Sequence, residues 1–329
     1  MDSRSSLWAT VFVAHDVAVI ETAETGFPDW LADPQGPLGP DAVLVAGQAL
    51  RQWGLSETWR VRLGGPEPRS VIVKRGTGEM AEEARRYREL VVPLGIAAAG
   101  LLAAQGGEDG QPVVLVLEDL GPETLEQRPT VEGYEEAART LARMRASAAR
   151  RLSQGPAIGT GLRWTGEDFA DTAGRAAVAL AALRPDLDGA LDTPAKVLIS
   201  RLDRLSGQPD TLVHGDFQAK NLIHAAQGSI IPVDWPGAYV HPHLGDLYLL
   251  AREARNHEHI LKVDPDALVE VFAQAAGSDP ASVHDQMMIG GLCWTMIALR
   301  WVVEVGVHAV PISAEWVDEL VADLRSLAG

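Results

Sequence analysis

Short apolar segments separated by turns dominate the first third of the chain. Residues 8–21 (WATVFVAHDVAVIE) predict two short strands around a polar turn. Residues 58–63 and 70–75 predict a second strand pair, because the intervening GGPEPR is a turn sequence. The continuous apolar run at residues 113–117 (VVLVL) is typical of a buried strand. The N-terminal third is therefore predicted to be rich in β-structure.

Helical periodicity appears twice in the N-terminal third and predominates in the rest of the chain. Residues 42–53 have helical spacing with Gly54 as a stop, and residues 79–91 predict a charged helix with one apolar face. Residues 134–147 repeat apolar positions at helical spacing, and Thr193-Pro194 is typical of a helix start. The last eighty residues also have helical patterns.

Two short apolar strands interrupt the helical region, at residues 211–213 and 229–233. A β-rich N-terminal third followed by a mainly helical remainder indicates an α+β fold with two lobes. The length of 329 residues is sufficient for two packed lobes, and an apolar content of 47% supplies their cores.

Composition excludes several classes of protein. The chain carries 28 basic and 45 acidic side chains, a net charge of −17, so we expect no nucleic-acid partner. One cysteine, Cys293, rules out an internal disulfide. The longest apolar run, residues 287–299, is shorter than the roughly 20 residues that span a bilayer, and no secretory signal is visible. We therefore expect a cytoplasmic protein with no membrane partner; the sequence leaves its oligomeric state open.

The strongest chemical signal lies around the two short strands, in TLVHGDFQAKNLI and SIIPVDW. Asp216 follows the first strand, Asn221 comes five residues later, and Asp234 ends the second strand. Phosphoryl transfer needs such a set: one carboxylate for the attacking hydroxyl, and an amide oxygen and a second carboxylate for Mg²⁺. Oxygen ligands suit a hard cation, whereas His or Cys would indicate zinc.

These residues resemble the aminoglycoside phosphotransferase and choline kinase-like family, which is related to the protein kinases. The family's three motifs occur in order within a short stretch: His214-Gly215-Asp216 with Asn221, then Val233-Asp234-Trp235, then Gly245-Asp246-Leu247. The resemblance implies a two-lobed, protein kinase-like fold with a β-rich N-lobe and a mainly helical C-lobe. It implies ATP and Mg²⁺ as cofactors, Asp216 as the catalytic residue, and Asn221 and Asp234 as metal ligands. His214 and Asp246 are expected to brace the loop.

The N-terminal half extends the resemblance to nucleotide binding. Lys74 matches the family lysine that contacts the α- and β-phosphates, and Glu83 matches its partner on the next helix. Glu82 and Glu89 are rivals for the position of Glu83.

The run VLVLEDLGP resembles the hinge between the lobes, where the backbone of Glu118 and Leu120 would bind adenine. Residues 54–58 (GLSET), including Ser56, lie where the family places its nucleotide-covering loop. No G-x-G-x-x-G pattern is present.

The resemblance suggests three divisions of the chain: an N-terminal hairpin extension (1–38), a nucleotide-binding N-lobe (39–119) and a helical C-lobe with the acceptor site (120–329). Only eleven residues separate Asp234 from Asp246, which leaves no room for the long activation segment of a protein kinase. We therefore expect a phosphotransferase that acts on a hydroxyl group of a small molecule. A nucleotide-binding pseudokinase and a protein kinase are the alternatives.

Several points stay open at the level of sequence. The acceptor could be an aminoglycoside or other antibiotic, an amino alcohol, a sugar or a nucleoside-like metabolite, and the preference for ATP over GTP is not fixed. Asp168, Glu253 and Glu304 suggest a cationic acceptor. Lys220 is either solvated or directed at Asp216. The pairs His241/His243 and His257/His259 are expected to be surface or packing residues, because no third ligand accompanies them.

Overall fold

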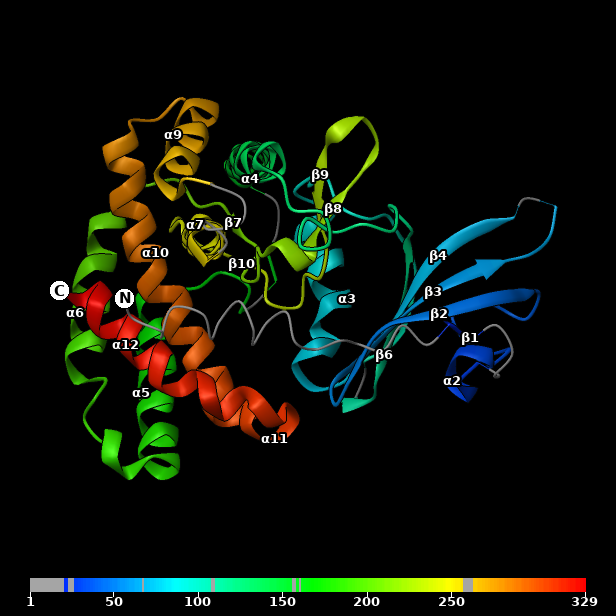
Figure 1. Cartoon of the computed structure of the whole chain (residues 1–329), viewed down its shortest axis with the longest axis horizontal. Coiled ribbons are helices and arrows are strands. Elements are labelled where there is room, and N and C mark those ends of the chain that lie inside the picture. Colours follow the sequence, from blue (N-terminus) through cyan, green and yellow to red (C-terminus); the bar gives the residue numbers. More distant parts are fainter. Residues whose placement is uncertain are drawn as a thin grey trace.

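The computed structural model shows two lobes side by side, a β-sheet lobe and a helical lobe (Figure 1). It describes residues 21–22, 27–66, 68–107, 110–155, 158–159, 161–256 and 263–329. Most of the strand pair predicted at residues 8–21 lies outside these described residues. The two-lobed α+β architecture expected from the sequence is confirmed.

The N-lobe is built on one antiparallel sheet of six strands in the order β1-β2-β3-β4-β6-β5. The predicted pair at residues 58–63 and 70–75 forms two central strands of this sheet. The strands are β1 (Glu21–Thr22), β2 (Leu44–Trp53), β3 (Ser56–Leu63), β4 (Arg69–Gly76), β5 (Leu101–Gly106) and β6 (Val113–Glu118). One face is covered by the short helix α2 (Asp29–Ala32), whose Leu31 joins a cluster that includes Val61 and Val73.

The helix predicted at residues 42–53 is wrong, because this segment is strand β2. Its pairing with β3 shifts register between Leu44 and Ala46 and again between Ala49 and Arg51. Each irregularity breaks the strict alternation of inward and outward side chains, so the strand does not show a period of two in the sequence. Gly54, which we interpreted as a helix stop, lies instead in the turn of the β2–β3 hairpin.

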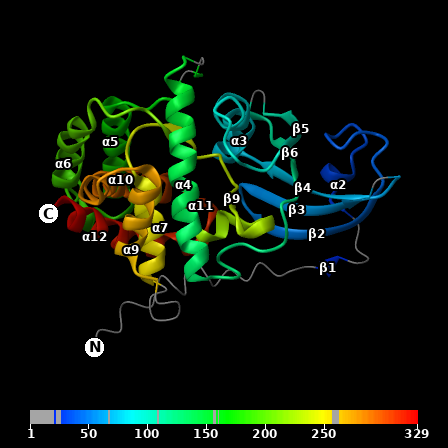
Figure 2. The same ribbon diagram turned by 90° about the horizontal axis from the view of Figure 1, so that it is seen from above.

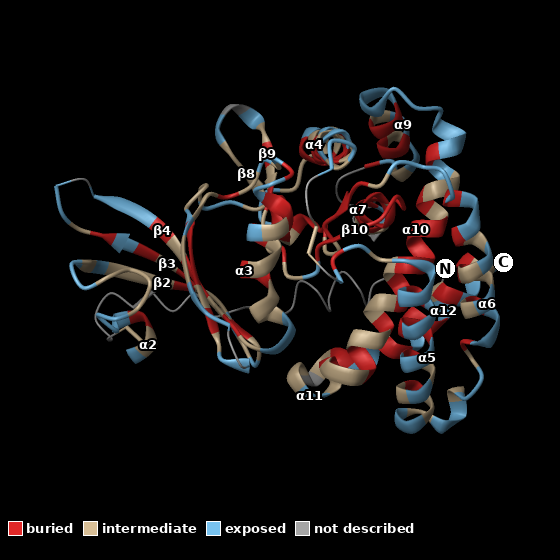
Figure 3. Ribbon diagram, turned by 180° about the vertical axis from the view of Figure 1, so that it is seen from behind, coloured by how far each residue is buried: buried red, intermediate tan, exposed pale blue. Residues whose placement is uncertain are grey.

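The charged helix predicted at residues 79–91 is present, but it changes pitch along its length. A 3₁₀ turn (Gly78–Glu82) leads into one turn of α-helix, α3 (Glu83–Arg86), and then into a π turn (Tyr87–Val91). Tyr87 and Leu90 are buried in the core shared with β6 and the C-lobe. Figure 3 shows this helix between the sheet and the helical lobe, and its buried positions begin at Glu83.

The C-lobe is mainly helical, as predicted for residues 134–147, for the helix near Thr193 and for the C-terminal region. Its helices are α4 (Val131–Leu152), α5 (Gly166–Leu183), α6 (Asp192–Leu202), α7 (Gly245–Asn256), α9 (Pro265–Ala276), α10 (Pro280–Trp301), α11 (Val307–Ala309) and α12 (Val317–Ala328). Helix α10 packs against α5, α7 and α12 and so forms the centre of the lobe (Figure 2).

The segment Pro280–Ala309 is, by length and composition, the one helix among the described residues that could cross a membrane. Of its most apolar stretch, 56% is buried inside the structure. This burial is what a central core helix requires, and it agrees with our expectation of a buried helix at residues 287–299.

Two small antiparallel ribbons flank the catalytic-loop and Asp234 motifs. One pairs β7 (Leu212–Val213) with β10 (Tyr239–Val240), and the other pairs β8 (Leu222–His224) with β9 (Ile230–Pro232). Strands β7 and β9 were predicted, whereas β5, β8 and β10 were not.

Gly290 sets the distance between α10 and the start of α7. A Cβ atom at this position would lie 2.2 Å from Gly245 N and 2.4 Å from Leu244 C, both backbone atoms. We expect Gly290→Ala to lower the free energy of unfolding by about 1–3 kcal/mol, because neither backbone can yield without moving α7. Gly174→Ala is the control, since Gly174 is an exposed position within α5 with open space around it. It should instead stabilise the chain by about 0.5–1 kcal/mol through helix propensity. Urea unfolding of both variants measures the difference, and equal effects would contradict the close packing.

Candidate active site

The loop from His214 to Asn221 connects β7 to β8 and is held from below by α7. Asp246, in the first turn of α7, accepts hydrogen bonds from His214 N (2.7 Å) and Gly215 N (2.9 Å). Gly215 has a φ of +88°, and a Cβ there would lie 2.6 Å from Gly237 O. Only glycine fits this combination of left-handed backbone and close approach. The fixed start of the loop determines where Asp216 lies.

The His214 ring fastens the same loop to the following strand. Its Nδ1 accepts from Asp216 N (3.2 Å), so its Nε2 carries the proton and donates to Val233 O (3.1 Å). Complete burial lowers the pKa of His214 and keeps the ring neutral, although nearby carboxylates oppose that shift. The structure thus places His214 and Asp246 beneath the loop, away from its open side.

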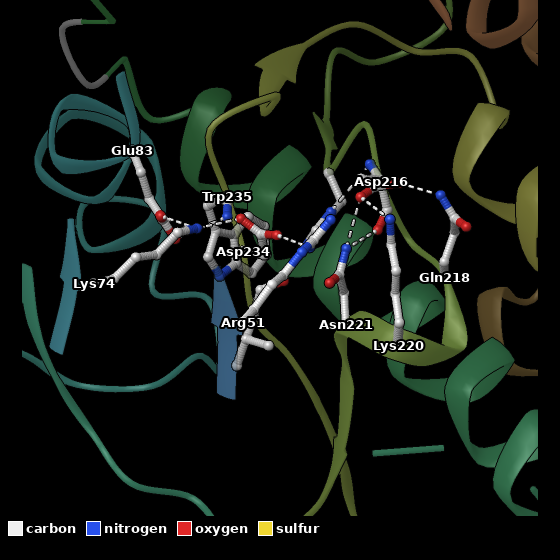
Figure 4. Close-up of polar contacts among 11 residues, drawn as sticks. Arg51, Lys74, Glu83, Asp216, Gln218, Lys220, Asn221, Asp234 and Trp235 are labelled. Atoms are coloured by element: carbon white, nitrogen blue, oxygen red, sulfur yellow. Dashed lines mark hydrogen bonds and ion pairs between the residues drawn. The ribbon is translucent and has the colours of Figure 1, made fainter. Parts of the chain in front are cut away.

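The Asp216 carboxylate lies at the centre of a group of donors (Figure 4). Asn221 Nδ2 donates to its Oδ2 (2.8 Å), and Lys220 Nζ lies 3.2 Å from the same oxygen. Gln218 Nε2 contacts the other oxygen. From the sequence, Lys220 was either solvated or directed at Asp216, and the structure shows the second arrangement. Gln218 was not predicted, because its position two residues after Asp216 carries no distinctive pattern. The Asp216 side chain remains 34% exposed, so a ligand can reach it.

Within the described part of the chain, Asp234 is the one residue other than glycine whose backbone is left-handed, with a φ of +71°. Aspartate tolerates this region better than most residues other than glycine, and such backbone conformations are concentrated at functional sites. A hydrogen bond from Val233 N to Asn221 O (2.9 Å) brings Asp234 next to Asn221. Burial raises the pKa of Asp234, but the charges of Lys74 and Arg51 outweigh burial, so the pKa lies below its usual range and the carboxylate is ionised.

Lys74 joins Asp234 to the N-lobe. Its Nζ lies 2.5 Å from Glu83 Oε2 and also contacts Asp234 Oδ1, and the lysine and glutamate side chains are only 7% and 0% exposed. Burial lowers the pKa of Lys74, yet the two carboxylates more than compensate, so its pKa is raised and it stays charged. Glu82 and Glu89 both pair with Arg85 instead. The structure therefore selects Glu83 as the lysine's partner.

The segment predicted to be the hinge lies at the end of β6, and side chains of β3 and β4 hold it through hydrogen bonds. Asp119 accepts from Arg60 Nε (2.8 Å) and Ser70 Oγ (2.6 Å), a pair of contacts that the sequence did not indicate because Arg60 lies 59 residues away. Glu118 Oε2 accepts from Gly100 N (3.2 Å). Within the described residues, the backbone N–H and C=O of Leu120 make no hydrogen bond to protein, so both can face a nucleotide base.

The nucleotide-covering loop is shorter than residues 54–58. Gly54 and Leu55 alone form the turn, and Ser56 is the first residue of β3 with an exposure of 5%. Of the residues predicted to bind nucleotide, Ser56 thus has little surface for a ligand.

The site has the donor set that Mg²⁺ uses. The Asn221 amide nitrogen is occupied by Asp216, which leaves the amide oxygen as its ligand atom next to the ionised Asp234. No group of three or more His, Cys, Asp or Glu side chains in the described part of the chain is arranged to hold a metal. Magnesium typically takes one or two protein ligands and fills the rest of its shell with phosphate oxygens and water, so Asn221 and Asp234 are sufficient to hold it.

The other residues that the sequence suggested for binding a metal or a cationic acceptor mostly make contacts that support the fold. His241 and His243 are buried, and the His243 ring lies 2.7 Å from the Tyr239 hydroxyl; His257 and His259 lie outside the described residues. Asp168 closes a capping box with Thr165, and Glu304 pairs with Arg175 and Arg300. Of the three acidic residues that suggested a cationic acceptor, only Glu253 contacts the catalytic loop, through Ala219 N (2.8 Å).

The two-lobed fold, the braced loop and the buried Lys74–Glu83 pair define the class of kinase-like phosphotransferases. Residues 49–285 match the model of the phosphotransferase enzyme family (APH), so the chain belongs to this family. The family is one of phosphotransferases, so the chain is a phosphotransferase. The family resemblance inferred from the sequence motifs is confirmed.

Solved structures share the fold at low sequence identity. A ternary complex of aminoglycoside phosphotransferase APH(4)-Ia with ADP and hygromycin B has 17% identity and a TM-score of 0.59, covering 87% of this chain and 95% of that one. A provisionally assigned aminoglycoside phosphotransferase from Ralstonia eutropha JMP134 has 13% identity and a TM-score of 0.59, with coverages of 87% and 92%. A microcompartment-associated aminopropanol kinase has 15% identity and a TM-score of 0.57, with coverages of 88% and 91%. A comparison with curated proteins finds no match.

Glu253 gives the site a pH-dependent stability. Burial raises its pKa from 4.5 to about 7, although the hydrogen bond from Ala219 N opposes the shift. The folded chain therefore retains a proton that the unfolded chain has lost. This group's contribution to stability is complete below about pH 4.5 and disappears as the pH rises through about 7.

Glu253→Gln cannot ionise but still accepts from Ala219 N. We expect its free energy of unfolding, relative to that of the wild type, to be higher at pH 8 than at pH 5. Urea unfolding at the two pH values measures this gain, with the exposed Glu132→Gln as control. A Glu253→Gln effect that is the same at both pH values would contradict the raised pKa.

Proposed function

We propose that this enzyme transfers the γ-phosphate of ATP to a hydroxyl of a small molecule with the help of Mg²⁺. The observation that carries the proposal is the position of Asp216 and Asp234, which are tied to each other through Asn221 and to the N-lobe through Lys74. Asn221 and Asp234 would hold a Mg²⁺ ion, which would supply positive charge to the phosphates.

The protein's own residues supply the remaining functions. Asp216, partly exposed and held by Asn221, orients the acceptor hydroxyl and receives its proton. Asn221 and Asp234 present oxygens to the metal. Lys74, fixed by Glu83, offers its charge to the α- and β-phosphates, and the backbone of Leu120 offers a donor and an acceptor to the adenine ring.

The acceptor is proposed to be a small hydroxyl compound, and amine-bearing ones should be tested first. Two similar structures are named for aminoglycoside and aminopropanol substrates, which are amino sugars and amino alcohols. We further propose that the enzyme works in the cytoplasm.

A screen of hydroxyl-bearing antibiotics, amino alcohols and sugars tests the function directly. Incubation with MgATP should increase the mass of the true acceptor by one phosphate, as read by mass spectrometry. Neutral sugars and proteins belong in the same panel, because labelling of a protein alone would favour the protein kinase alternative. Nucleotide binding without transfer to any compound would favour the pseudokinase.

Asp216→Ala should lower turnover by about 10²–10⁴-fold, because it removes the group that accepts the hydroxyl proton. Nucleotide affinity should change little, since Asp216 faces the acceptor. Steady-state kinetics and calorimetry with ATP measure the two effects separately, and the exposed Asp188→Ala is the control. Near-normal turnover in Asp216→Ala would remove Asp216 from the mechanism.

Asp234→Asn should weaken the dependence of ATP affinity on Mg²⁺, because an uncharged side chain replaces the ionised ligand. Titration of ATP with and without magnesium measures this. A variant that keeps the full magnesium dependence of the wild type would place the metal elsewhere.

A further inference from the structure

A third cation, Arg51, lies against the proposed metal ligand from the N-lobe. Its Nη1 is 3.7 Å from Asp234 Oδ2, on the opposite side of the carboxylate from Lys74 (Figure 4). The two cations differ in accessibility: the Lys74 side chain is 7% exposed and already paired with Glu83, whereas the Arg51 side chain is 42% exposed. Of the two, Arg51 therefore has more side-chain surface with which to contact a ligand.

Arg51 extends from β2 toward the catalytic loop, and its guanidinium lies between Asp234 and the Asp216 carboxylate (Figure 4). On the C-lobe side, Lys220 Nζ lies 3.2 Å from Asp216 Oδ2. The N-lobe thus contributes Arg51, and the C-lobe contributes Lys220, to the region between Asp234 and the catalytic loop.

The guanidinium of Arg51 is supported by aromatic rings. Its Cζ is 5.5 Å from the ring centroid of Trp53, and Trp53 meets Trp301 of α10 edge-on at 6.2 Å. Next to Trp53, Gly54 lies where a Cβ would be 3.5 Å from Ala309 O. The end of β2 is therefore backed by the C-lobe, which limits the freedom of Arg51 and orients it before a ligand arrives.

We propose that Arg51 binds the terminal phosphoryl group of the nucleotide and stabilises its charge during transfer. This inference rests on the proposed function, in which the phosphoryl group passes from the metal side at Asp234 to the acceptor at Asp216. The space that Arg51 faces lies between these two residues. A planar guanidinium matches two phosphate oxygens at once, and phosphoryl transfer gains most from positive charge placed at those oxygens. The 3.7 Å ion pair with Asp234 is long, so Arg51 can exchange it for phosphate.

The test compares two nucleotides that differ in the terminal phosphate. Calorimetry in the presence of Mg²⁺ gives the affinities of ADP and of AMP-PNP for the wild type, Arg51→Ala, Arg51→Lys and Arg62→Ala. Arg62 is an exposed arginine on β3 and serves as the matched control. We expect Arg51→Ala to lower the affinity for AMP-PNP by about 10-fold or more, as for a lost charge-assisted hydrogen bond, with less than about a 2-fold change for ADP. Arg51→Lys should recover part of the loss, since it keeps the charge without the fork.

The ratio of the two affinities decides the result, because a fraction of unfolded protein in a preparation alters both titrations alike. An unchanged ratio in Arg51→Ala, or an equal loss for ADP and AMP-PNP, would overturn the role of Arg51. The same loss of ratio in Arg62→Ala would also overturn it, because the effect would then be one of general charge. Failure of the wild type to bind either nucleotide would instead reject the proposed function itself. The wild-type affinities are therefore measured before any variant is compared.

Discussion

The buried ion group of Lys74, Glu83 and Asp234 is the interaction on which the site depends. It joins β4, helix α3 and the segment after β9, and Glu83 closes the group by accepting from Trp235 N (3.1 Å). Removing three charges from water is expensive, and loss of one partner from a buried pair typically costs about 3–5 kcal/mol because the other charge is left uncompensated. The lobes therefore cannot separate at this point without exposing the group, and their relation at the site is fixed by electrostatics.

Contacts at the periphery reinforce this central connection. Arg86 Nε donates to Pro236 O (3.3 Å) close to the ion group, and Arg300 of α10 reaches Glu79 on the N-lobe at 3.1 Å. The hydrogen bond is long and the Glu79 side chain is 44% exposed, so these contacts are individually weak. Their positions matter more than their strength. They add two further connections between the lobes, so that a ligand meets a site already assembled from both lobes.

The sequence indicated those parts of the site that are local, and it missed the parts created by pairing between distant segments. Asp216, Asn221 and Asp234 lie within nineteen residues, so their spacing alone carried the chemistry. The partner of Lys74 was ambiguous because three glutamates lie on neighbouring helical turns, and only the burial of Glu83 separates them. β2 was read as a helix because two register shifts hid its alternation. The same error prevented the prediction of Arg51 as a site residue, because a helix at residues 42–53 gave no indication that this side chain would lie next to Asp234.

Overall charge says little about a site of this kind. A net charge of −17 opposes the approach of a polyanion such as ATP, yet at physiological salt that field is screened beyond about 8 Å. Within that distance the site presents Lys74, Lys220 and Arg51, each held against a carboxylate. Such pairing keeps the cations in position while no ligand is bound. Binding of a metal and phosphate can then replace the partner of each charged side chain with another group of opposite charge. The charged side chains are therefore already in position when the nucleotide arrives. An acidic chain can in this way hold a phosphate-binding centre that its composition does not reveal.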